Sequence, residues 1–311
     1  MSKTKHGKNA HSIMIFQELS AIETRFRQTG QGGEYALRPI AIPVPGESLT
    51  LNGLLCTPNH RSGYYHDSVY PKERIVLHFT AGSLPSDMGA LTRQDYHVSV
   101  PFVIARDGTI YQLYSSRFWS GNLGGDAVGN HDTGNDQDKR TIGIEISNHG
   151  PLTVQSDNLA TFYDGLYCPL TQSVAYQKLT EPFRGETYFA TFTPQQYNSL
   201  TVLLRYLTAQ YAIPRKFLPK AKRFVTRTDV LTFRGIVSHV NYRASGKWDI
   251  GPAFNWARLI RDVQAPVFAQ PQNQSFDGFN QPILSSEEAL IPLLPKPRPA
   301  VYENEPYDEM E

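Results

Sequence analysis

The order of hydrophobic and polar residues predicts β-strands between residues 74 and 147. Residues 74–80 are β-branched and apolar, which is typical of a central strand that is buried on both faces. In such a strand His78 and Thr80 share one face, because successive side chains alternate. Residues 141–147 alternate strictly, so that three isoleucines pack on one face and Glu145 lies on the other.

Two shorter apolar runs, residues 102–105 and 109–114, are joined through Asp107 and Gly108. An Asp-Gly pair between two such runs is a strong hairpin signal, so the runs are predicted to pair as antiparallel strands. Residues 235–239 are predicted to form a further strand.

Two helices are predicted in the second half of the chain. Thr193, Pro194 and Gln196 combine an N-cap, a proline at the first helical position and a capping box. The apolar stripe of this helix, which we expect to lie across the sheet, consists of Tyr197, Leu200, Leu203, Leu204 and Leu207. Pro252 is predicted to open the last helix, whose apolar side consists of Ala253, Trp256, Ala257 and Ile260.

The remaining segments have weaker patterns. The stretch that ends at Gly33 is loosely helical and predicts a short docking helix. Residues 35–70 are rich in Pro, Gly, Asn and Tyr, which predicts an irregular lead-in with short strands. Residues 154–190 predict an elaborate surface insertion. Past Gln264 the chain is rich in Pro, Gln, Ser and Glu, which predicts a flexible tail.

The predicted elements form one core over residues 71–264, preceded by an extension over residues 1–70 and followed by the tail over residues 265–311. With 311 residues, of which 40% are hydrophobic and 19% charged, the chain suits one α/β domain with extensions. Cys56 and Cys168 match neither a metal knuckle nor a redox motif, so we interpret both as ordinary thiols.

Charge and hydropathy argue against two classes of partner. A net charge of +1 lacks the excess of Lys and Arg that binding to a phosphate backbone requires, so no nucleic acid is expected. No apolar run approaches the roughly 20 residues that cross a bilayer, and the basic start leads into no signal-type apolar segment. We therefore expect a protein that has no membrane span and is cytoplasmic when made.

Candidate chemistry lies at the ends of the predicted strands. A single His in an apolar strand is more often a hydrogen-bonded core residue than a metal ligand. Together, however, His78, His239 and Asp249 form the set of two imidazoles and one carboxylate that holds a catalytic zinc ion and leaves one position open. Glu145 could accept a proton from a water in that position, or it could be a surface carboxylate on the open face of the sheet.

Three strings carry a family resemblance: residues 77–82 (LHFTAG), 141–148 (TIGIEISN) and 238–252 (SHVNYRASGKWDIGP). As a set they resemble the zinc-dependent N-acetylmuramoyl-L-alanine amidases of type 2, which are also similar to the peptidoglycan recognition proteins. The resemblance runs from about residue 74 to about residue 260, is interrupted by the insertion, and covers neither end of the chain. It implies a central mixed β-sheet flanked by helices.

The resemblance implies roles for five residues. His78, His239 and Asp249 match the three zinc ligands, Glu145 matches the general base, and Lys247 matches the lysine that stabilises the negative oxygen during attack. Lys247 could also be a solvated loop residue, but its place between the second and third ligands favours the functional role.

The resemblance is less specific for the residues that bind the substrate. The chain departs from the family pattern where relatives often carry two histidines and a proline, and the residues found here are Pro101, Ser120 and Ile250. None of these departures removes a metal ligand. The candidates for substrate binding are Thr80, Trp119 and Asn148.

The implied activity is zinc-dependent hydrolysis of the amide bond between N-acetylmuramic acid and L-alanine in peptidoglycan, with lysis of the cell wall as the expected role. The alternatives are a non-catalytic module that binds muropeptides, a cytoplasmic amidase that recycles them, and a metal hydrolase of another amide. Without an export signal, a wall enzyme would be released by lysis or injected. A delivery or assembly partner would then contact the tail or the N-terminal extension.

Overall fold

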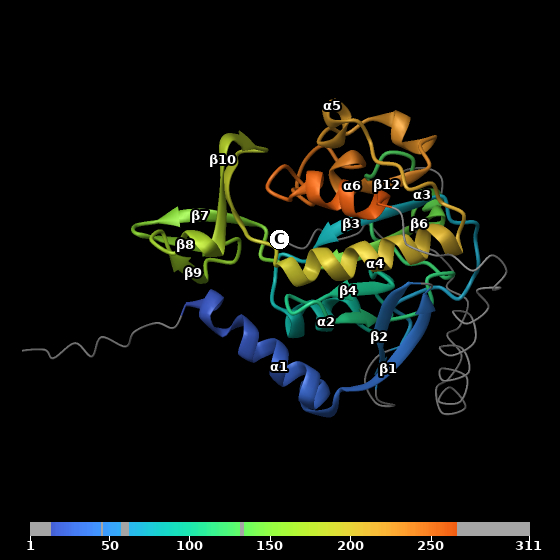
Figure 1. Ribbon diagram of the computed structural model, residues 1–311, viewed down its shortest axis with the longest axis horizontal. Coiled ribbons are helices and arrows are strands. Elements are labelled where there is room, and N and C mark those ends of the chain that lie inside the picture. Colours follow the sequence, from blue (N-terminus) through green and yellow to red (C-terminus); the bar gives the residue numbers. More distant parts are fainter. Residues whose placement is uncertain (1–13, 45, 57–61, 131–133, 266–311) are drawn as a thin grey trace, which may run out of the picture.

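The computed structural model describes residues 14–44, 46–56, 62–130 and 134–265 (Figure 1). The α-helices are α1 (Ile15–Gly33), α2 (Leu84–Leu91), α3 (Asp136–Arg140), α4 (Pro194–Gln210), α5 (Lys220–Arg223) and α6 (Trp256–Gln264). The strands are β1 (Tyr35–Val44), β2 (Glu47–Cys56), β3 (Arg74–Phe79), β4 (Phe102–Ile104), β5 (Ile110–Gln112), β6 (Thr141–Ile146), β7 (Pro151–Gln155), β8 (Asn158–Thr161), β9 (Leu166–Pro169), β10 (Tyr176–Phe183), β11 (Glu186–Ala190) and β12 (Gly235–Ser238).

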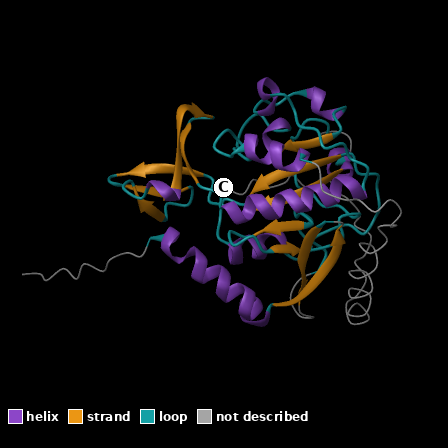
Figure 2. Ribbon diagram, viewed as in Figure 1, coloured by secondary structure: helices purple, strands orange, loops and turns teal. Residues whose placement is uncertain are grey.

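A seven-stranded sheet crosses the middle of the molecule in the order β1-β2-β5-β4-β6-β3-β12 (Figures 1 and 2). Strands β4, β6, β3 and β12 are parallel, and β2 is parallel to β5. The β1–β2 and β4–β5 pairs are antiparallel, the second of them as the Asp-Gly turn predicts. The predicted α/β architecture, a central mixed sheet flanked by helices, is therefore confirmed.

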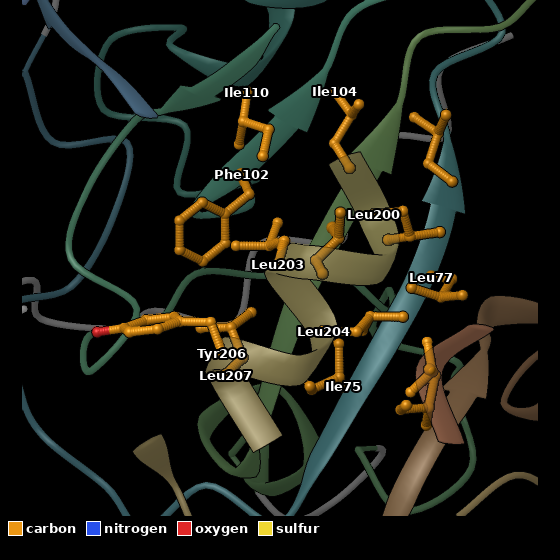
Figure 3. Close-up of a cluster of buried hydrophobic side chains, with 14 of the residues drawn as sticks. Ile75, Leu77, Phe102, Ile104, Ile110, Leu200, Leu203, Leu204, Tyr206 and Leu207 are labelled. Atoms are coloured by element: carbon orange, nitrogen blue, oxygen red, sulfur yellow. The ribbon is translucent and has the colours of Figure 1, made fainter. Parts of the chain in front are cut away.

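One face of the central strands is packed against α4. Ile75 and Leu77 of β3 lie in register with Ile142 and Ile144 of β6, and none of these four side chains is more than 1% exposed. Figure 3 shows Ile75 and Leu77 beside the leucines of α4, and all four side chains belong to one buried cluster with Leu200, Leu203, Leu204 and Leu207. A fully buried Leu stabilises a fold by about 1.5–3 kcal/mol, so this layer is a major part of the core.

The start of α4 agrees with the prediction. The Thr193 side chain accepts a hydrogen bond from the backbone N–H of Gln196 at 3.1 Å, and the Gln196 side chain accepts one from the backbone N–H of Thr193 at 3.0 Å. Pro194 occupies the first turn, where its missing N–H leaves no hydrogen bond unmade.

The opposite face of β3 and β6 carries polar groups. His78 and Glu145 are direct neighbours in the parallel register. Gly143 lies two residues before Glu145 in β6 and is therefore on the same face of the sheet. A Cβ atom on Gly143 would lie 2.5 Å from Val100 and 3.3 Å from the Asn122 side chain. Glycine at this position therefore allows the loop that contains Asn122 to pass close over the sheet.

The N-terminal part differs from its prediction. The expected irregular lead-in contains two strands of ten residues each, β1 and β2, and β2 joins the central sheet beside β5. Pro39 and Pro43 in β1 concealed this pairing, but a proline is tolerated in an edge strand, where its missing N–H interrupts no second ladder. The expected docking helix is α1, whose Glu23 accepts hydrogen bonds from the backbone N–H groups of Arg106 and Asp107 at 2.9 and 3.2 Å.

The predicted insertion is a second, five-stranded sheet in the order β10-β11-β7-β8-β9. Its pairs are antiparallel. Leu19 of α1 packs in one buried cluster with Leu152, Leu159 and Tyr167 of this sheet. In Figure 1 the second sheet lies to the left of the central sheet, beyond the end of β3. This is the end of the sheet at which His78 is located.

The last helix begins at Trp256, later than the predicted start at Pro252. Asn255 is its N-cap and accepts a hydrogen bond from the backbone N–H of Arg258 at 3.0 Å, whereas Pro252 lies in a preceding turn. The buried side of α6 consists of Trp256, Leu259 and Val263. The expected tail lies outside the described residues apart from Ala265, and the division of the chain into extension, domain and tail stays a prediction.

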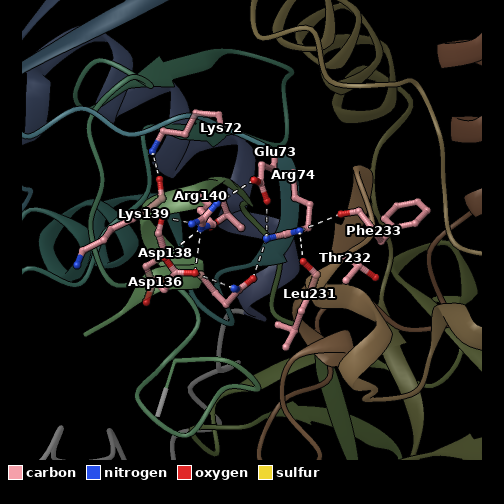
Figure 4. A network of polar contacts seen from close by, with 12 residues as sticks. Lys72, Glu73, Arg74, Asp136, Asp138, Lys139, Arg140, Leu231, Thr232 and Phe233 are labelled. Atoms are coloured by element: carbon pink, nitrogen blue, oxygen red, sulfur yellow. Dashed lines mark hydrogen bonds and ion pairs between the residues drawn. The ribbon is translucent and has the colours of Figure 1, made fainter. Parts of the chain in front are cut away.

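A buried polar network ties α3 to the start of β3 (Figure 4). Arg74 is fully buried, and its guanidinium donates to the backbone oxygens of Leu231 and Phe233 at 2.9 and 3.0 Å and to the Gln137 side chain at 2.8 Å. Lys72 donates to the carbonyl of Lys139 at 2.8 Å, and burial lowers the pKa of Lys72 to about 7. The position of α3 is thus fixed from two sides.

Within the described part of the chain, no helix combines the length and apolar character needed to span a membrane. Cys168 is buried and Cys56 is half-buried. Burial raises the pKa of the Cys168 thiol to about 11, which keeps it protonated at neutral pH.

Candidate metal centre and active site

Three side chains predicted as metal ligands converge on one point. His78 Nδ1 lies 3.0 Å from His239 Nδ1 and 3.1 Å from Asp249 Oδ2, and His239 Nδ1 lies 2.9 Å from the same oxygen. All three residues are buried, with exposed fractions of 1%, 3% and 5%. His78 precedes His239 by 161 residues, so only the fold brings it beside the other two ligands.

The sheet explains how they meet. β3 and β12 are adjacent parallel strands, with Leu77 paired to Ser238, so the residues that follow these partners lie at the same edge of the sheet. His78 and His239 are these following residues. The loop after His239 folds back, and the carbonyl of Asp249 accepts the backbone N–H of Val240 at 2.9 Å. This bond holds the third ligand beside the second.

The outer nitrogens of the two imidazoles fix their tautomers. His239 Nε2 lies 3.0 Å from the carbonyl oxygen of Leu123, which can only accept, so this nitrogen carries a hydrogen. His78 Nε2 lies 3.2 Å from Oδ1 of Asn122. The amide nitrogen of Asn122 donates to Asp138 at 2.9 Å, which directs the amide oxygen toward His78. In the neutral form of each imidazole, Nδ1 is therefore the nitrogen without a hydrogen, and it faces Asp249.

This donor set fits a zinc ion. Three donor atoms of a tetrahedral zinc ion with bonds of about 2.0–2.1 Å are about 3.3 Å apart, close to the spacing seen here. Burial lowers the pKa of His239 to about 4, which keeps its imidazole neutral. Burial also acts to lower the pKa of His78, but the hydrogen bond to Asp249 and the charges of Glu145 and Asp249 raise it above the ordinary value, so a metal ion would displace a proton there. Burial opposes ionisation of Asp249, but the two histidines beside it hold its pKa well below the usual range. Neutral imidazoles and an ionised carboxylate are the forms that bind a metal.

Glu145 lies beside this centre with an unused oxygen. It is paired with His78 across β3 and β6, and its Oε2 is buried and has no hydrogen-bond partner among the residues that the structure describes. Burial raises its pKa to about 7, with a further contribution from Asp249 that His78 and Lys247 oppose. A carboxylate with a pKa near 7 is suited to accept and return a proton at neutral pH.

Lys247 places a positive charge on the same centre. Its side chain is half-buried, and its charge lowers the pKa values of both Glu145 and His239, so the ammonium group lies near both residues. Its backbone oxygen accepts a hydrogen bond from the guanidinium of Arg184 at 2.6 Å. The second sheet therefore supports the loop that carries Lys247.

Asn122 and Asp138, which the sequence did not indicate, support the metal ligands on the side of their outer imidazole nitrogens. Asp138 is 2% exposed and accepts hydrogen bonds from the backbone N–H groups of Asn122 and Leu123 at 2.7 and 3.0 Å, and from Asn130 at 2.6 Å. Burial raises the pKa of Asp138 to about 6, and these N–H donors oppose that rise. Through Asn122 and Leu123 this carboxylate positions both histidine ligands.

The three substrate-binding candidates lie in different surroundings. The Asn148 amide is buried and donates to the carbonyls of Ala190 and Thr191, where the second sheet joins the domain. Thr80 is half-buried, and its hydroxyl accepts the backbone N–H of Asn148 at 3.3 Å. Trp119 stacks on His66 with ring centroids 4.1 Å apart. The role of all three in substrate binding stays a prediction.

Several solved structures of amidases are similar to this chain. AmiD from E. coli, in a complex with anhydro-N-acetylmuramic acid-L-Ala-D-gamma-Glu-L-Lys, is 21% identical over 71% of this chain and 65% of its own, with a TM-score of 0.41. AmpDh3 from Pseudomonas aeruginosa, in complex with anhydromuramic pentapeptide, is 16% identical over 67% of this chain and 65% of its own, with a TM-score of 0.38. The N-acetylmuramoyl-L-alanine amidase LysC from Clostridium intestinale is 18% identical over 67% of this chain and 93% of its own, with a TM-score of 0.35. Values this low transfer neither a ligand nor an activity.

No curated protein matches the chain. A family model described as N-acetylmuramoyl-L-alanine amidase matches residues 69–252. This match spans more than half of the 311 residues and includes the three converging ligands together with Glu145 and Lys247. The chain therefore belongs to the N-acetylmuramoyl-L-alanine amidase family.

Proposed function

We propose that this chain uses zinc to hydrolyse the amide bond between the lactyl group of N-acetylmuramic acid and L-alanine in peptidoglycan. One observation carries the proposal: Nδ1 of His78, Nδ1 of His239 and Oδ2 of Asp249 lie 2.9–3.1 Å apart. Membership of the amidase family supports the choice of bond. Glu145 and Lys247 beside the ligands favour an enzyme over a module that only binds muropeptides.

The residues divide the chemistry as follows. When bound by the three ligands, zinc would supply Lewis acidity, which lowers the pKa of a water from about 15.7 to about 7. Glu145 is placed to accept a proton from the water that attacks the lactyl carbonyl, and Lys247 is placed to stabilise the negative oxygen that develops. Glu145 then returns the proton to the alanine nitrogen as the carbon–nitrogen bond breaks. The products are a lactyl carboxylate and a stem peptide with a free amino group.

The first experiment measures metal and activity on the same preparation. Elemental analysis of protein that never met a chelator is expected to give about one zinc per chain, and His239→Ala is expected to lose it. Mass spectrometry of digested peptidoglycan is expected to show free stem peptides. Protein without zinc, or products cut at another bond, would refute the proposal.

We also propose that the substrate is the polymeric wall, and not a soluble fragment. The second sheet adds surface next to the metal ligands, which a long substrate can use and a single muropeptide does not need. Incubation with intact sacculi and with soluble anhydro-muropeptides compares the two roles. Release from sacculi supports wall lysis, whereas cleavage of the soluble fragments alone supports recycling. Delivery by lysis, by injection or by a partner stays a prediction.

A further inference from the structure

The second sheet presents aromatic side chains beside the metal ligands. Phe162 and Tyr163, in the turn between β8 and β9, are 50% and 60% exposed. The Phe162 ring lies 5.3 Å from Tyr163 and 6.0 Å from Trp248, measured between centroids. Trp248 is half-buried and is the residue between Lys247 and Asp249. We name Phe162, Tyr163 and Trp248 the aromatic platform.

Hydrogen bonds hold both parts of this platform in place. The backbone N–H of Thr161 donates to Gly165 at 2.8 Å, and that of Asp164 donates to Thr161 at 3.0 Å, which closes the turn. The indole N–H of Trp248 donates to the carbonyl of Arg184 at 3.2 Å. These bonds fix the backbone of the turn that carries Phe162 and Tyr163, and they orient the indole of Trp248.

Exposure of neighbouring aromatic rings is unfavourable in water, and a grouped apolar surface on a soluble protein typically marks a binding site. This surface lies beside the active site, because Phe162 contacts Trp248, the residue between Lys247 and the metal ligand Asp249. An occupant of this surface that reaches the metal ligands belongs to the same substrate. In peptidoglycan the cleaved amide has a glycan strand on one side and a stem peptide on the other, so the platform faces one of these two.

We propose that the aromatic platform binds pyranose rings of the glycan strand, an inference that rests on the proposed function. The face of an aromatic ring carries partial negative charge and attracts the C–H groups on one face of a sugar ring. Asp164, the exposed residue after Tyr163, can accept hydrogen bonds from sugar hydroxyls. The same carboxylate repels the carboxylates of a stem peptide. The platform thus selects a polymer over a fragment with a single sugar.

The test compares Phe162→Ala and Tyr163→Ala with Val154→Ala, a control on β7 of the same sheet whose side chain is 54% exposed. Each aromatic variant is expected to lower the cleavage rate of intact sacculi by about tenfold, the size expected for one lost ring contact. Cleavage of a single-sugar muropeptide is expected to stay within about twofold. The control is expected to match the wild type on both substrates. Equal losses on both substrates, or no loss on sacculi, would overturn the proposal.

A binding experiment separates this proposal from the proposed function. Peptide-free glycan strands of alternating N-acetylglucosamine and N-acetylmuramic acid are titrated into the wild type, Phe162→Ala and Phe162→Leu. The wild type is expected to bind, and both variants to bind less, because leucine keeps the apolar bulk but lacks the aromatic face. Binding by a wild type that cleaves nothing would support the platform and reject the amidase activity. Binding of free stem peptide that Phe162→Ala abolishes would overturn the assignment to glycan.

Discussion

Replacement of Asp138 by Asn tests whether the polypeptide holds both histidine ligands from behind. The Asp138 carboxylate accepts four hydrogen bonds, from the backbone and side chain of Asn122, from Leu123 and from Asn130. Asn122 and Leu123 in turn accept the outer N–H groups of the two histidines. Asparagine has the same shape but only one side-chain oxygen. In at least one of the four contacts, an N–H donor would therefore face the N–H group of the asparagine and lose its hydrogen bond.

Two effects on stability oppose each other in this variant. A lost hydrogen bond to a charged acceptor together with a buried unpaired donor destabilises the fold by about 2–4 kcal/mol. Against this, burial raises the pKa of Asp138 from 3.8 to about 6 even with these hydrogen bonds in place, so removal of the buried charge offsets this loss at neutral pH. We therefore expect a small change in melting temperature and a clear loss of zinc affinity, of about 10–100-fold.

The assay is a competition titration of zinc against a chromophoric chelator, with thermal unfolding of the metal-free proteins measured in parallel. Asp136→Asn is the matched control, because Asp136 belongs to the same short helix but its half-exposed carboxylate pairs with Arg140 at 2.9 Å. This control is expected to bind zinc like the wild type. A zinc affinity of Asp138→Asn within about twofold of the wild type would refute the reasoning. Equal losses in both variants would assign the effect to the helix and not to Asp138.

Glu145→Gln is expected to keep zinc and to lower kcat by about 10²–10⁴, as for removal of a general base, and a rate close to that of the wild type would point to another base. Because burial raises the pKa of Glu145 from 4.5 to about 7, the unfolded state ionises first, and the stability of the metal-free wild type is expected to fall as pH rises through this range. Urea unfolding of metal-free Glu145→Gln is expected to show a flatter profile. Lys247→Ala is expected to lower kcat by about 10²–10³ with a smaller change in KM, and a change in KM alone would make Lys247 a substrate-binding residue. Thr193→Ala removes the cap of α4 and is expected to lower the free energy of unfolding by about 1 kcal/mol, which an unchanged urea midpoint would contradict.

The strands around the site could be predicted because the alternation of apolar and polar residues shows which side of each strand is buried. In β6 the isoleucines alternate with residues of the opposite face, and the register with β3 then places Glu145 beside His78. The start of α4 was equally readable, since a capping box is a local signal. These elements need no information from distant parts of the chain.

Other elements depend on distant contacts and left no such signal. β1 contains two prolines, and its pairing with β2 is possible because it lies at the edge of the sheet, a position that the sequence does not reveal. Asn122 lies in an irregular loop and Asp138 in a polar stretch, so neither pattern indicates a buried network. Both residues matter because that loop crosses the sheet at Gly143, which only the assembled fold shows.

The second sheet also supports the loop that carries the third metal ligand. The Arg184 guanidinium, in the turn between β10 and β11, donates to the carbonyl of Lys247 at 2.6 Å and to that of Val240 at 3.1 Å. These two carbonyls bracket the loop between the second and third metal ligands, and a planar guanidinium can reach both at once. The indole of Trp248 returns a hydrogen bond to the Arg184 carbonyl at 3.2 Å. The insertion therefore holds the segment that carries Lys247, Trp248 and Asp249, so the geometry of catalysis and the exposed rings beside it depend on the same contact.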